Sequence, residues 1–74
     1  MMRITVRLFA SLRKGRFDAE VREAAPGTTV SNIVDDIQIP GSIGIIFVNG
    51  RNADLSHELA DGDTLSIFPL VGGG

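Results

Sequence analysis

The sequence predicts a single small α+β domain in which one helix packs on one face of a mixed sheet of four or five strands. Three observations predict this fold class. Apolar and polar residues alternate with period two near both ends of the chain, apolar residues recur once at helical spacing between them, and turn signals separate the segments. Two strands, one helix and then further strands are typical of a sheet covered on one face.

Two strands are expected before the helix, over residues 3–9 and 17–22. The basic connection between them is short and contains a glycine, which favours an antiparallel hairpin. Phe9 is the exception in the first strand because it falls on the polar side. The alternation predicts that the core-facing residues are Ile4, Val6 and Leu8 in the first strand and Phe17, Ala19 and Val21 in the second.

The helix is expected to begin after Thr29, whose side chain can cap it. A helix this short is not stable alone, so it must lie on the sheet. The acids Asp35 and Asp36 fall on its far side. Its apolar stripe has the spacing i, i+3, i+4, i+7 and consists of Val30, Ile33, Val34 and Ile37.

Further strands are expected after the helix. Residues 43–48 are almost wholly apolar, which predicts a central strand or one whose second face is covered. The Asn49-Gly50 turn leads into a short edge strand within residues 51–55. The last strand covers residues 64–68, and Pro69 should end its pairing because proline donates no ladder hydrogen bond.

The domain is expected to span residues 1–69, and residues 70–74 are expected to form a flexible tail that ends in three glycines. Two interpretations of this tail are open. Chain ends are commonly frayed, and glycine is the residue most easily left disordered. Alternatively, the carboxylate of Gly74 is the working group, and the glycines connect it to the domain by a thin, flexible segment.

The composition excludes several classes of function. Because the sequence has no cysteine, a disulfide framework, a thiolate metal site and a cysteine nucleophile are excluded. A net charge of −2 argues against bulk nucleic-acid binding. With no apolar run of membrane-spanning length and no signal peptide, the protein is expected to be soluble and cytoplasmic. Five of the seven basic residues lie in the first sixteen positions, which indicates either a solvated surface or a docking patch for an acidic partner.

No metal site is expected. The acids of Asp35-Asp36 and of Asp61-Gly62-Asp63 are more simply a solvated helix end and a turn, because no third type of ligand clusters nearby. His57, a lone histidine in a polar loop, is assigned no role. Gly41 and Gly44 do not form a phosphate loop, because a strand and no Lys-Ser/Thr pair follows them.

Four stretches occur together in an order shared with a known family. They are Leu8-Phe9-Ala10-Ser11-Leu12-Arg13, Pro26-Gly27-Thr28-Thr29-Val30, Val48-Asn49-Gly50 and the run from Leu59 to Gly74. In these stretches the chain resembles the MoaD/ThiS family of ubiquitin-like β-grasp sulfur carriers. The first stretch, and the lead-in from Ile67 to Val71, look most similar to the small subunit of molybdopterin synthase.

The resemblance implies a chemistry that starts at Gly74. A partner adenylating enzyme of the MoeB/ThiF type joins this carboxylate to AMP, using ATP and magnesium that belong to the partner. A sulfur donor then displaces AMP and leaves a thiocarboxylate. The large subunit of molybdopterin synthase takes up the sulfur, while Val71, Gly72 and Gly73 carry the reacting end into each partner. The carrier itself is then no enzyme and holds no cofactor.

The resemblance also implies that the first and last strands are adjacent and parallel, which brings Phe9 and Phe68 together on the face away from the helix. These rings form either a small cluster covered by loops or an exposed apolar patch that binds a partner, and we favour the patch because one helix covers one face. The residues predicted to bind a partner are Phe68, Phe9, Pro69, Leu70, Arg7 and Arg13, the two arginines as the rim.

Three alternatives remain beside a carrier for molybdopterin synthesis. The first is the ThiS-type carrier that works with thiazole synthase in thiamine synthesis. The second is a protein modifier whose Gly74 forms isopeptide bonds with lysines. The third is a β-grasp interaction module whose terminal glycines are simply frayed. The free chain is expected to be monomeric.

Overall fold

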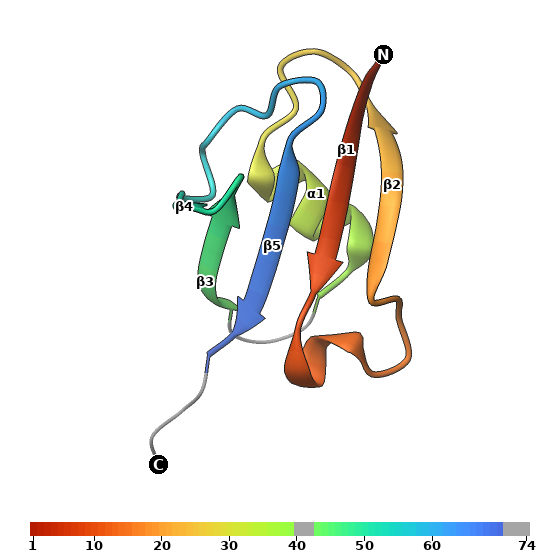
Figure 1. The fold of residues 1–74 in the computed structure, drawn as a ribbon, viewed down its shortest axis with the longest axis vertical. Coiled ribbons are helices and arrows are strands. Elements are labelled where there is room, and N and C mark those ends of the chain that lie inside the picture. Colours follow the sequence, from red (N-terminus) through yellow and green to blue (C-terminus); the bar gives the residue numbers. More distant parts are fainter. Residues whose placement is uncertain (40–42, 71–74) are drawn as a thin grey trace.

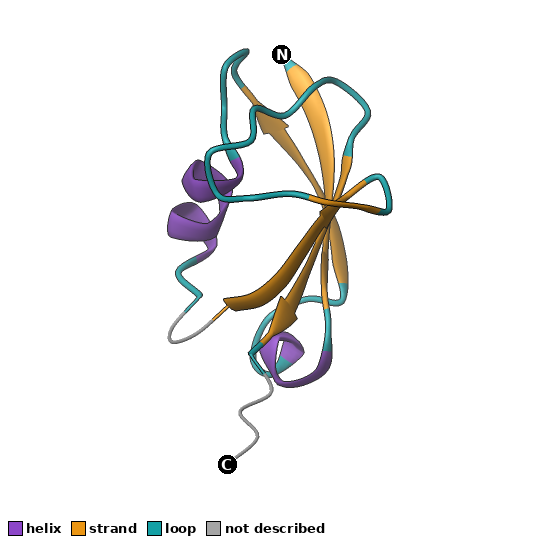
Figure 2. Cartoon of the chain, turned by 90° about the vertical axis from the view of Figure 1, so that its left-hand side faces the viewer, coloured by secondary structure: helices purple, strands orange, loops and turns teal. Residues whose placement is uncertain are grey.

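The computed structural model describes residues 1–39 and 43–70, in which five strands form one mixed sheet in the order β2-β1-β5-β3-β4. Figures 1 and 2 show α1 lying across one face of the sheet while the other face is left open. The predicted fold class is therefore confirmed. In chain order the elements are β1 (Met2–Leu8), the 3-10 helix η1 (Ala10–Arg13), β2 (Ala19–Ala24), α1 (Val30–Ile37), β3 (Ile43–Val48), β4 (Arg51–Asn52) and β5 (Thr64–Pro69).

The pairing places the first and last strands of the described chain side by side. β1 runs parallel to β5, with Leu8 opposite Ile67, and antiparallel to β2. β5 is also antiparallel to β3, so it lies in the middle of the sheet. Because β1 and β5 are parallel neighbours, the segments that follow both strands leave the sheet at the same end, as Figure 1 shows.

The core lies between α1 and the sheet. Helix α1 begins with a capping box in which the Thr29 side chain accepts from the backbone N–H of Asn32, at 3.2 Å, and the Asn32 side chain accepts from Thr29 N–H, at 3.0 Å. The predicted helix and its cap are thus confirmed. The large side chains that are fully buried, each at most 2% exposed, are Ile4, Val6, Leu8, Val30, Leu65 and Ile67.

The predicted orientation of β2 is wrong for Ala19 and Val21, whereas Phe17, which precedes the strand, packs against the core as predicted. Ile4 pairs with Arg22, so it is Arg22 that shares the face of the core, while Val21 lies on the open face and is 61% exposed. β2 is an edge strand at which α1 leaves room for a long polar side chain. The apolar stem of Arg22 can cover the core there while its guanidinium donates to the carboxylates of Glu20 and of Asp36 in α1.

Other boundaries differ more locally. The first strand ends at Leu8, and the basic connection that follows contains η1, whose C-cap Lys14 donates its backbone N–H to the Ser11 carbonyl. Strand β4 has two residues where a strand within residues 51–55 was expected. The last strand extends one residue beyond the predicted range of 64–68, because Pro69 is paired with Ile43, and it ends at Pro69 as expected.

The predicted flexible tail at residues 70–74 lies outside the described residues apart from Leu70. Leu70 follows β5 directly and is 59% exposed. Across residues 1–39 and 43–70, none of the helices is long and apolar enough to cross a membrane.

Candidate functional site

Three phenylalanines gather on the open face of the sheet, at the end where β5 finishes. The rings of Phe9 and Phe68 are stacked, with centroids 4.2 Å apart and planes 10° from parallel. The ring of Phe47 meets Phe68 edge to face, with centroids 5.7 Å apart and an interplanar angle of 88°. The edge-to-face arrangement of Phe47 and Phe68 is one that aromatic pairs prefer. The predicted meeting of Phe9 and Phe68 is confirmed, and Phe47 of β3 joins them.

The backbone explains why these rings meet. Leu8 and Ile67 are register partners in the parallel β1–β5 pair, and the N–H of Phe9 donates to the carbonyl of Ile67 at 3.2 Å. The next residue along each strand, Phe9 and Phe68, therefore projects to the open face side by side. Phe68 is opposite Ile45 in β3, so Ile45 lies on the same face. We call Phe9, Phe47, Phe68 and Ile45 the aromatic patch.

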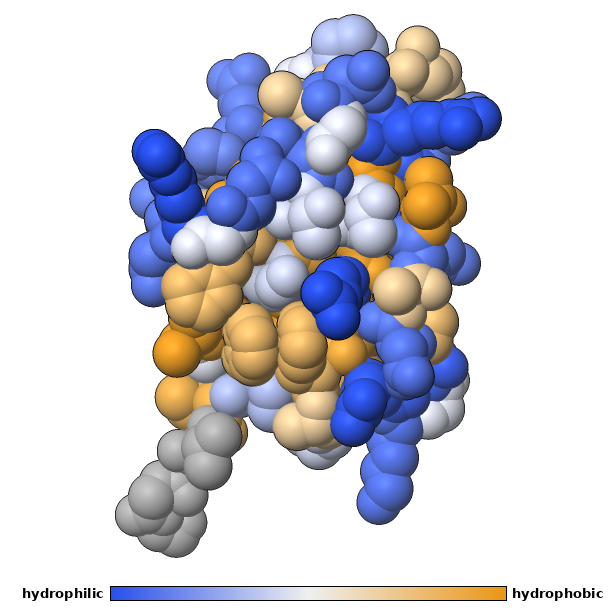
Figure 3. Space-filling model, in the orientation of Figure 1, coloured by the Kyte–Doolittle hydropathy of each residue, from blue (hydrophilic) through white to orange (hydrophobic). Residues whose placement is uncertain are grey.

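The aromatic patch is accessible over part of its surface. Ile45 is 47% exposed, and the three rings are half-buried. Figure 3 views the open face and shows apolar side chains gathered over the lower part of the sheet, next to where the last described residues leave it. Half-buried aromatic rings that are held by one another form a preorganised apolar surface, which is the kind of surface that partner proteins bind.

Basic side chains border this surface on the side of β1. The guanidinium carbon of Arg7 lies 5.3 Å from the centroid of the Phe9 ring, within the range of a cation–π contact. Arg13 is placed in η1, where its guanidinium lies 3.9 Å from the carboxylate of Asp18. Arg7 thus lies against the aromatic patch, whereas Arg13 forms an ion pair with Asp18, in the loop between η1 and β2.

The last described residues adjoin the aromatic patch. Pro69 is the register partner of Ile43, and the exposed Leu70 follows it. The predicted reacting group at Gly74, and the tail residues Val71, Gly72 and Gly73, lie outside the described residues. A segment that continues from Leu70 therefore starts directly beside the aromatic patch.

The acidic turn before β5 has a structural role. Asp63, which is 9% exposed, accepts hydrogen bonds from the Asn49 side chain at 2.8 Å and from Ala60 N–H at 2.7 Å. Asp61 accepts from the backbone N–H of Arg3 at 2.8 Å. Within the part of the chain that the structure describes, no three His, Cys, Asp or Glu side chains come close enough to hold a metal ion.

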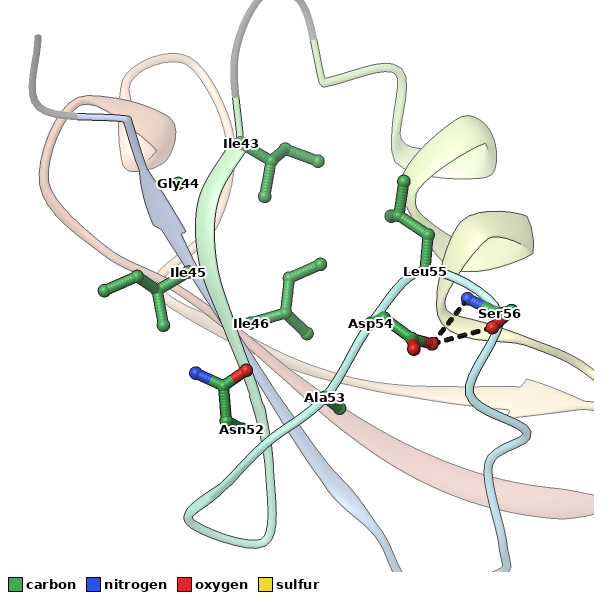
Figure 4. A pocket seen from close by; sticks show the side chains of 9 residues that line it. All are labelled: Ile43, Gly44, Ile45, Ile46, Asn52, Ala53, Asp54, Leu55 and Ser56. Atoms are coloured by element: carbon green, nitrogen blue, oxygen red, sulfur yellow. Dashed lines mark hydrogen bonds between the residues drawn. The ribbon is translucent and has the colours of Figure 1, made fainter.

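A groove of about 590 Å³ lies along β3 and the loop after β4, and no sequence pattern predicted it. Figure 4 shows Ile43, Ile46 and Leu55 around it, with the Asp54 carboxylate beside Ser56. The hydroxyl and N–H of Ser56 donate to Asp54 at 2.7 and 3.1 Å. The hydroxyl bond is the main reason why the pKa of Asp54 is lower than usual, and the His57 charge contributes.

The mixed sheet with one helix across one face defines a ubiquitin-like β-grasp protein. Residues 6–74 match the ThiS family, and the chain belongs to this family. Members of the ThiS/MoaD group are small carriers or subunits and are not catalysts themselves. No curated protein sequence matches the chain significantly.

Solved structures of the same fold include two relatives from molybdopterin synthesis. A putative molybdopterin converting factor subunit 1 from Pyrococcus furiosus is 28% identical, with a TM-score of 0.77 over 96% of this chain and 100% of that chain. A complex of subunits 1 and 2 of the molybdopterin-converting factor from Helicobacter pylori contains a chain 25% identical, with a TM-score of 0.69 over 99% and 100%.

A third similar structure is SAMP1, a small archaeal modifier protein of Haloferax volcanii. It is 26% identical to this chain, with a TM-score of 0.74 over 97% of this chain and 99% of that chain. The same fold therefore occurs in proteins named as molybdopterin converting factors and in a protein named as a modifier.

Proposed function

We propose that this protein carries sulfur as a thiocarboxylate at Gly74 and donates it in the synthesis of molybdopterin, for a molybdenum or tungsten cofactor. The observation that carries the proposal is the aromatic patch, which adjoins the point where the chain leaves β5 toward its terminal glycines. Membership of the ThiS family and the likeness to molybdopterin converting factor subunits support it.

The proposed chemistry has two steps, both performed by partner enzymes. In the first, a carboxylate oxygen of Gly74 attacks the α-phosphorus of ATP, pyrophosphate leaves, and an acyl adenylate forms. In the second, a sulfide-level nucleophile attacks the carbonyl carbon, the C–O bond to AMP breaks, and AMP leaves with that oxygen. ATP, magnesium and the catalytic groups belong to an adenylating enzyme of the MoeB/ThiF type and to the sulfur donor.

The domain contributes binding and placement. The rings of Phe9 and Phe68 would hold a partner against the open face, with Arg7 and Arg13 available to acids at the edge of its binding surface. Pro69 and Leu70 would lead the chain from that contact toward the reacting centre, through Val71 and the glycines. Glycines suit this task because they leave the chain narrow and unrestricted where it enters a catalytic site.

The same carrier must meet at least two partners in turn. The large subunit of molybdopterin synthase is the acceptor that the Helicobacter pylori complex favours, since that structure pairs a similar subunit with a second subunit. The adenylating enzyme would use the same open face, because the chain leaves β5 at Leu70 beside it. Binding to these two partners is then mutually exclusive, so the carrier must leave the adenylating enzyme before it meets the acceptor.

The test is to incubate the full chain with the adenylating enzyme of the same organism, ATP, magnesium and sulfide, and then to record its intact mass. Replacement of one oxygen by sulfur, lost when Gly74 is removed, supports a carrier. The thiocarboxylated chain is then offered to the large subunit of molybdopterin synthase with its pterin precursor, and separately to thiazole synthase. Sulfur transfer in the second reaction alone would assign the carrier to thiamine synthesis instead.

A modifier is the second candidate, and the likeness to SAMP1 favours it. In that case activated Gly74 would form isopeptide bonds with lysines of other proteins. Incubation with ATP and the adenylating enzyme in a cell extract would then give adducts of higher mass that depend on Gly74. An unchanged mass with every adenylating enzyme of the organism would leave a non-catalytic interaction module.

A further inference from the structure

Strand β3 contains a bulge opposite the end of β5. Ile45 pairs with Phe68, but the next pair toward the start of β3 is Ile43 with Pro69, so two steps along β3 match one step along β5. The extra residue is Gly44. The bulge also changes which side of the sheet Ile43 faces: it packs against the core together with Ile46, as Figure 4 shows, while Ile45 points to the other side. In a regular strand, residues three apart point to opposite faces.

Gly44 is in close contact with the last two described residues. A Cβ atom built on Gly44 would lie 2.6 Å from the carbonyl oxygen of Pro69 and 2.9 Å from the Cα of Leu70. Both are backbone atoms, so neither can rotate away as a side chain could. The backbone angle of Gly44 is not in the left-handed region, which distinguishes it from the glycines of the turns. Glycine is therefore required here for space and not for its dihedral freedom.

We propose that Gly44 is a positioning residue, which sets the path of the chain at Pro69 and Leu70 and so the direction in which the reacting C-terminal segment leaves the aromatic patch. The bulge brings the backbone of β3 against Pro69, and the missing side chain lets Leu70 cross it closely. Bulges commonly redirect a chain or end its pairing beside functional sites. Any side chain at this position would push the Pro69–Leu70 backbone away from β3.

This role rests on the proposed function, because a defined exit path matters only if the segment beyond Leu70 must enter a partner's catalytic site. The aromatic patch binds the partner's surface, and the exit path then determines where the segment arrives. A displacement at Leu70 should therefore leave binding largely intact and slow the chemical step. Misplacement by about 1 Å can reduce an enzymatic rate about 100-fold.

The test compares Gly44→Ala with Gly62→Ala. Gly62 has φ +86° and nothing within 4 Å of an added Cβ, so alanine there strains a turn at the far end of β5 without touching Pro69 or Leu70. It controls for lost stability. Adenylation is measured by pyrophosphate release with the organism's MoeB/ThiF-type enzyme, below the melting temperature of each variant. We expect Gly44→Ala to lower kcat about tenfold or more with little change in KM, and Gly62→Ala to retain the native kcat.

A second measurement does not depend on adenylation. In NMR spectra of the native protein, a nuclear Overhauser effect between the α-protons of Gly44 and Leu70 is expected, and in Gly44→Ala the largest chemical-shift changes should fall at residues 68–70. If the native chain is not adenylated at all, the proposed function fails, while these spectra still decide whether Gly44 positions the segment.

Two results would overturn the positioning role: native kcat in a folded Gly44→Ala variant, or unchanged spectra at residues 68–70. Should Gly44→Ala fail to fold, Pro69→Gly replaces it, because it frees the same segment without adding an atom. A lowered kcat in Pro69→Gly then supports the role, and a native kcat contradicts it.

Discussion

The ring of Phe68 lies flat against the ring of Phe9, with centroids 4.2 Å apart, although the two residues come from opposite ends of the chain. The parallel pairing of β1 with β5 produces this contact, because it carries both strands to the same end of the sheet. The ring contact thereby links the last strand to the end of the first at the point where the C-terminal segment begins. The same strand pairing therefore positions both the aromatic patch and the point where the chain leaves β5.

Replacing Phe68 with serine should weaken partner binding more than folding. The substitution removes the stack with Phe9 and the edge contact with Phe47, while the core on the other face is untouched. A central aromatic residue of an interface is worth about 2 kcal/mol or more, which is a loss of at least about 30-fold in affinity. Calorimetric titration with the adenylating enzyme or the large subunit, together with a thermal melt, measures both effects.

The matched control for that experiment is Val21→Ser, since Val21 is an apolar residue on the same open face but is 61% exposed and lies in β2. It should change neither binding nor the melting temperature appreciably. Equal free-energy losses in binding and folding for Phe68→Ser would contradict a partner-binding role for Phe68.

Arg7→Gln should slow association with the partner. Arg7 lies against Phe9 at the border of the aromatic patch, so its charge can steer an acidic partner toward that surface. We expect a lower association rate constant and a weaker dependence on salt, with a stability change of at most about 1 kcal/mol from the lost cation–π contact. Stopped-flow measurements over a series of salt concentrations test this. Arg3→Gln, with the same charge change on the same strand and face, should have a smaller effect.

Asn49→Ala should destabilise the domain by about 2–3 kcal/mol, because it removes two hydrogen bonds and places alanine in the left-handed region. The Asn49 side chain donates to Asp63 at 2.8 Å and accepts from Thr64 N–H at 2.9 Å, and its φ is +54°. Urea denaturation gives the free energy of unfolding. Asn49→Gly keeps the backbone relaxed and isolates the hydrogen bonds, so a loss as large as that of Asn49→Ala would show that strain contributes nothing.

Ser56→Ala should raise the pKa of Asp54 toward its usual value, because the Ser56 hydroxyl is the main cause of the lowered pKa. A carboxyl with a lowered folded-state pKa contributes stability above its unfolded pKa, and this contribution is lost as pH falls through the folded pKa. The stability difference between native and variant should therefore be present at neutral pH and vanish in acid. Carbon-detected NMR titration reports the pKa, with Ser11→Ala as the remote control. An unchanged pKa in Ser56→Ala would assign the shift to the backbone N–H of Ser56.

The elements with strong periodicity were predictable from the sequence. The stripe of α1, its cap at Thr29 and the alternation in β1 and β5 are set by local patterns that tertiary packing only reinforces. Which residues of β2 face the core was not predictable, because Phe17, Ala19 and Val21 have the right spacing for a core face. Only the three-dimensional position of Arg22, opposite Ile4 and near Asp36, places Arg22 on that face instead. Edge strands bury too little surface for hydrophobicity to decide their orientation.

The candidate site was predictable in part. Two phenylalanines on the polar sides of their strands indicated an apolar patch, and the family resemblance indicated that they meet. The position of Arg13 opposite Asp18 depends on η1, which no periodic pattern marks. Gly44 gave no signal at all, because a bulge follows from how β3 meets the end of β5 and not from any motif in β3. The one-residue extension of β5 to Pro69 was missed for the same reason.

Lys14 caps η1, which packs against β5 near the exit of the chain, and the sequence contains this one lysine beside six arginines. An activated carbonyl is an electrophile, and amines are the side chains most able to attack it. Arginine remains protonated at any physiological pH and does not compete. If Gly74 is activated as proposed, Lys14 offers the one side-chain amine of the protein that can consume its own acyl group, so peptide mapping should find self-acylation only at Lys14 and at the N-terminal amine.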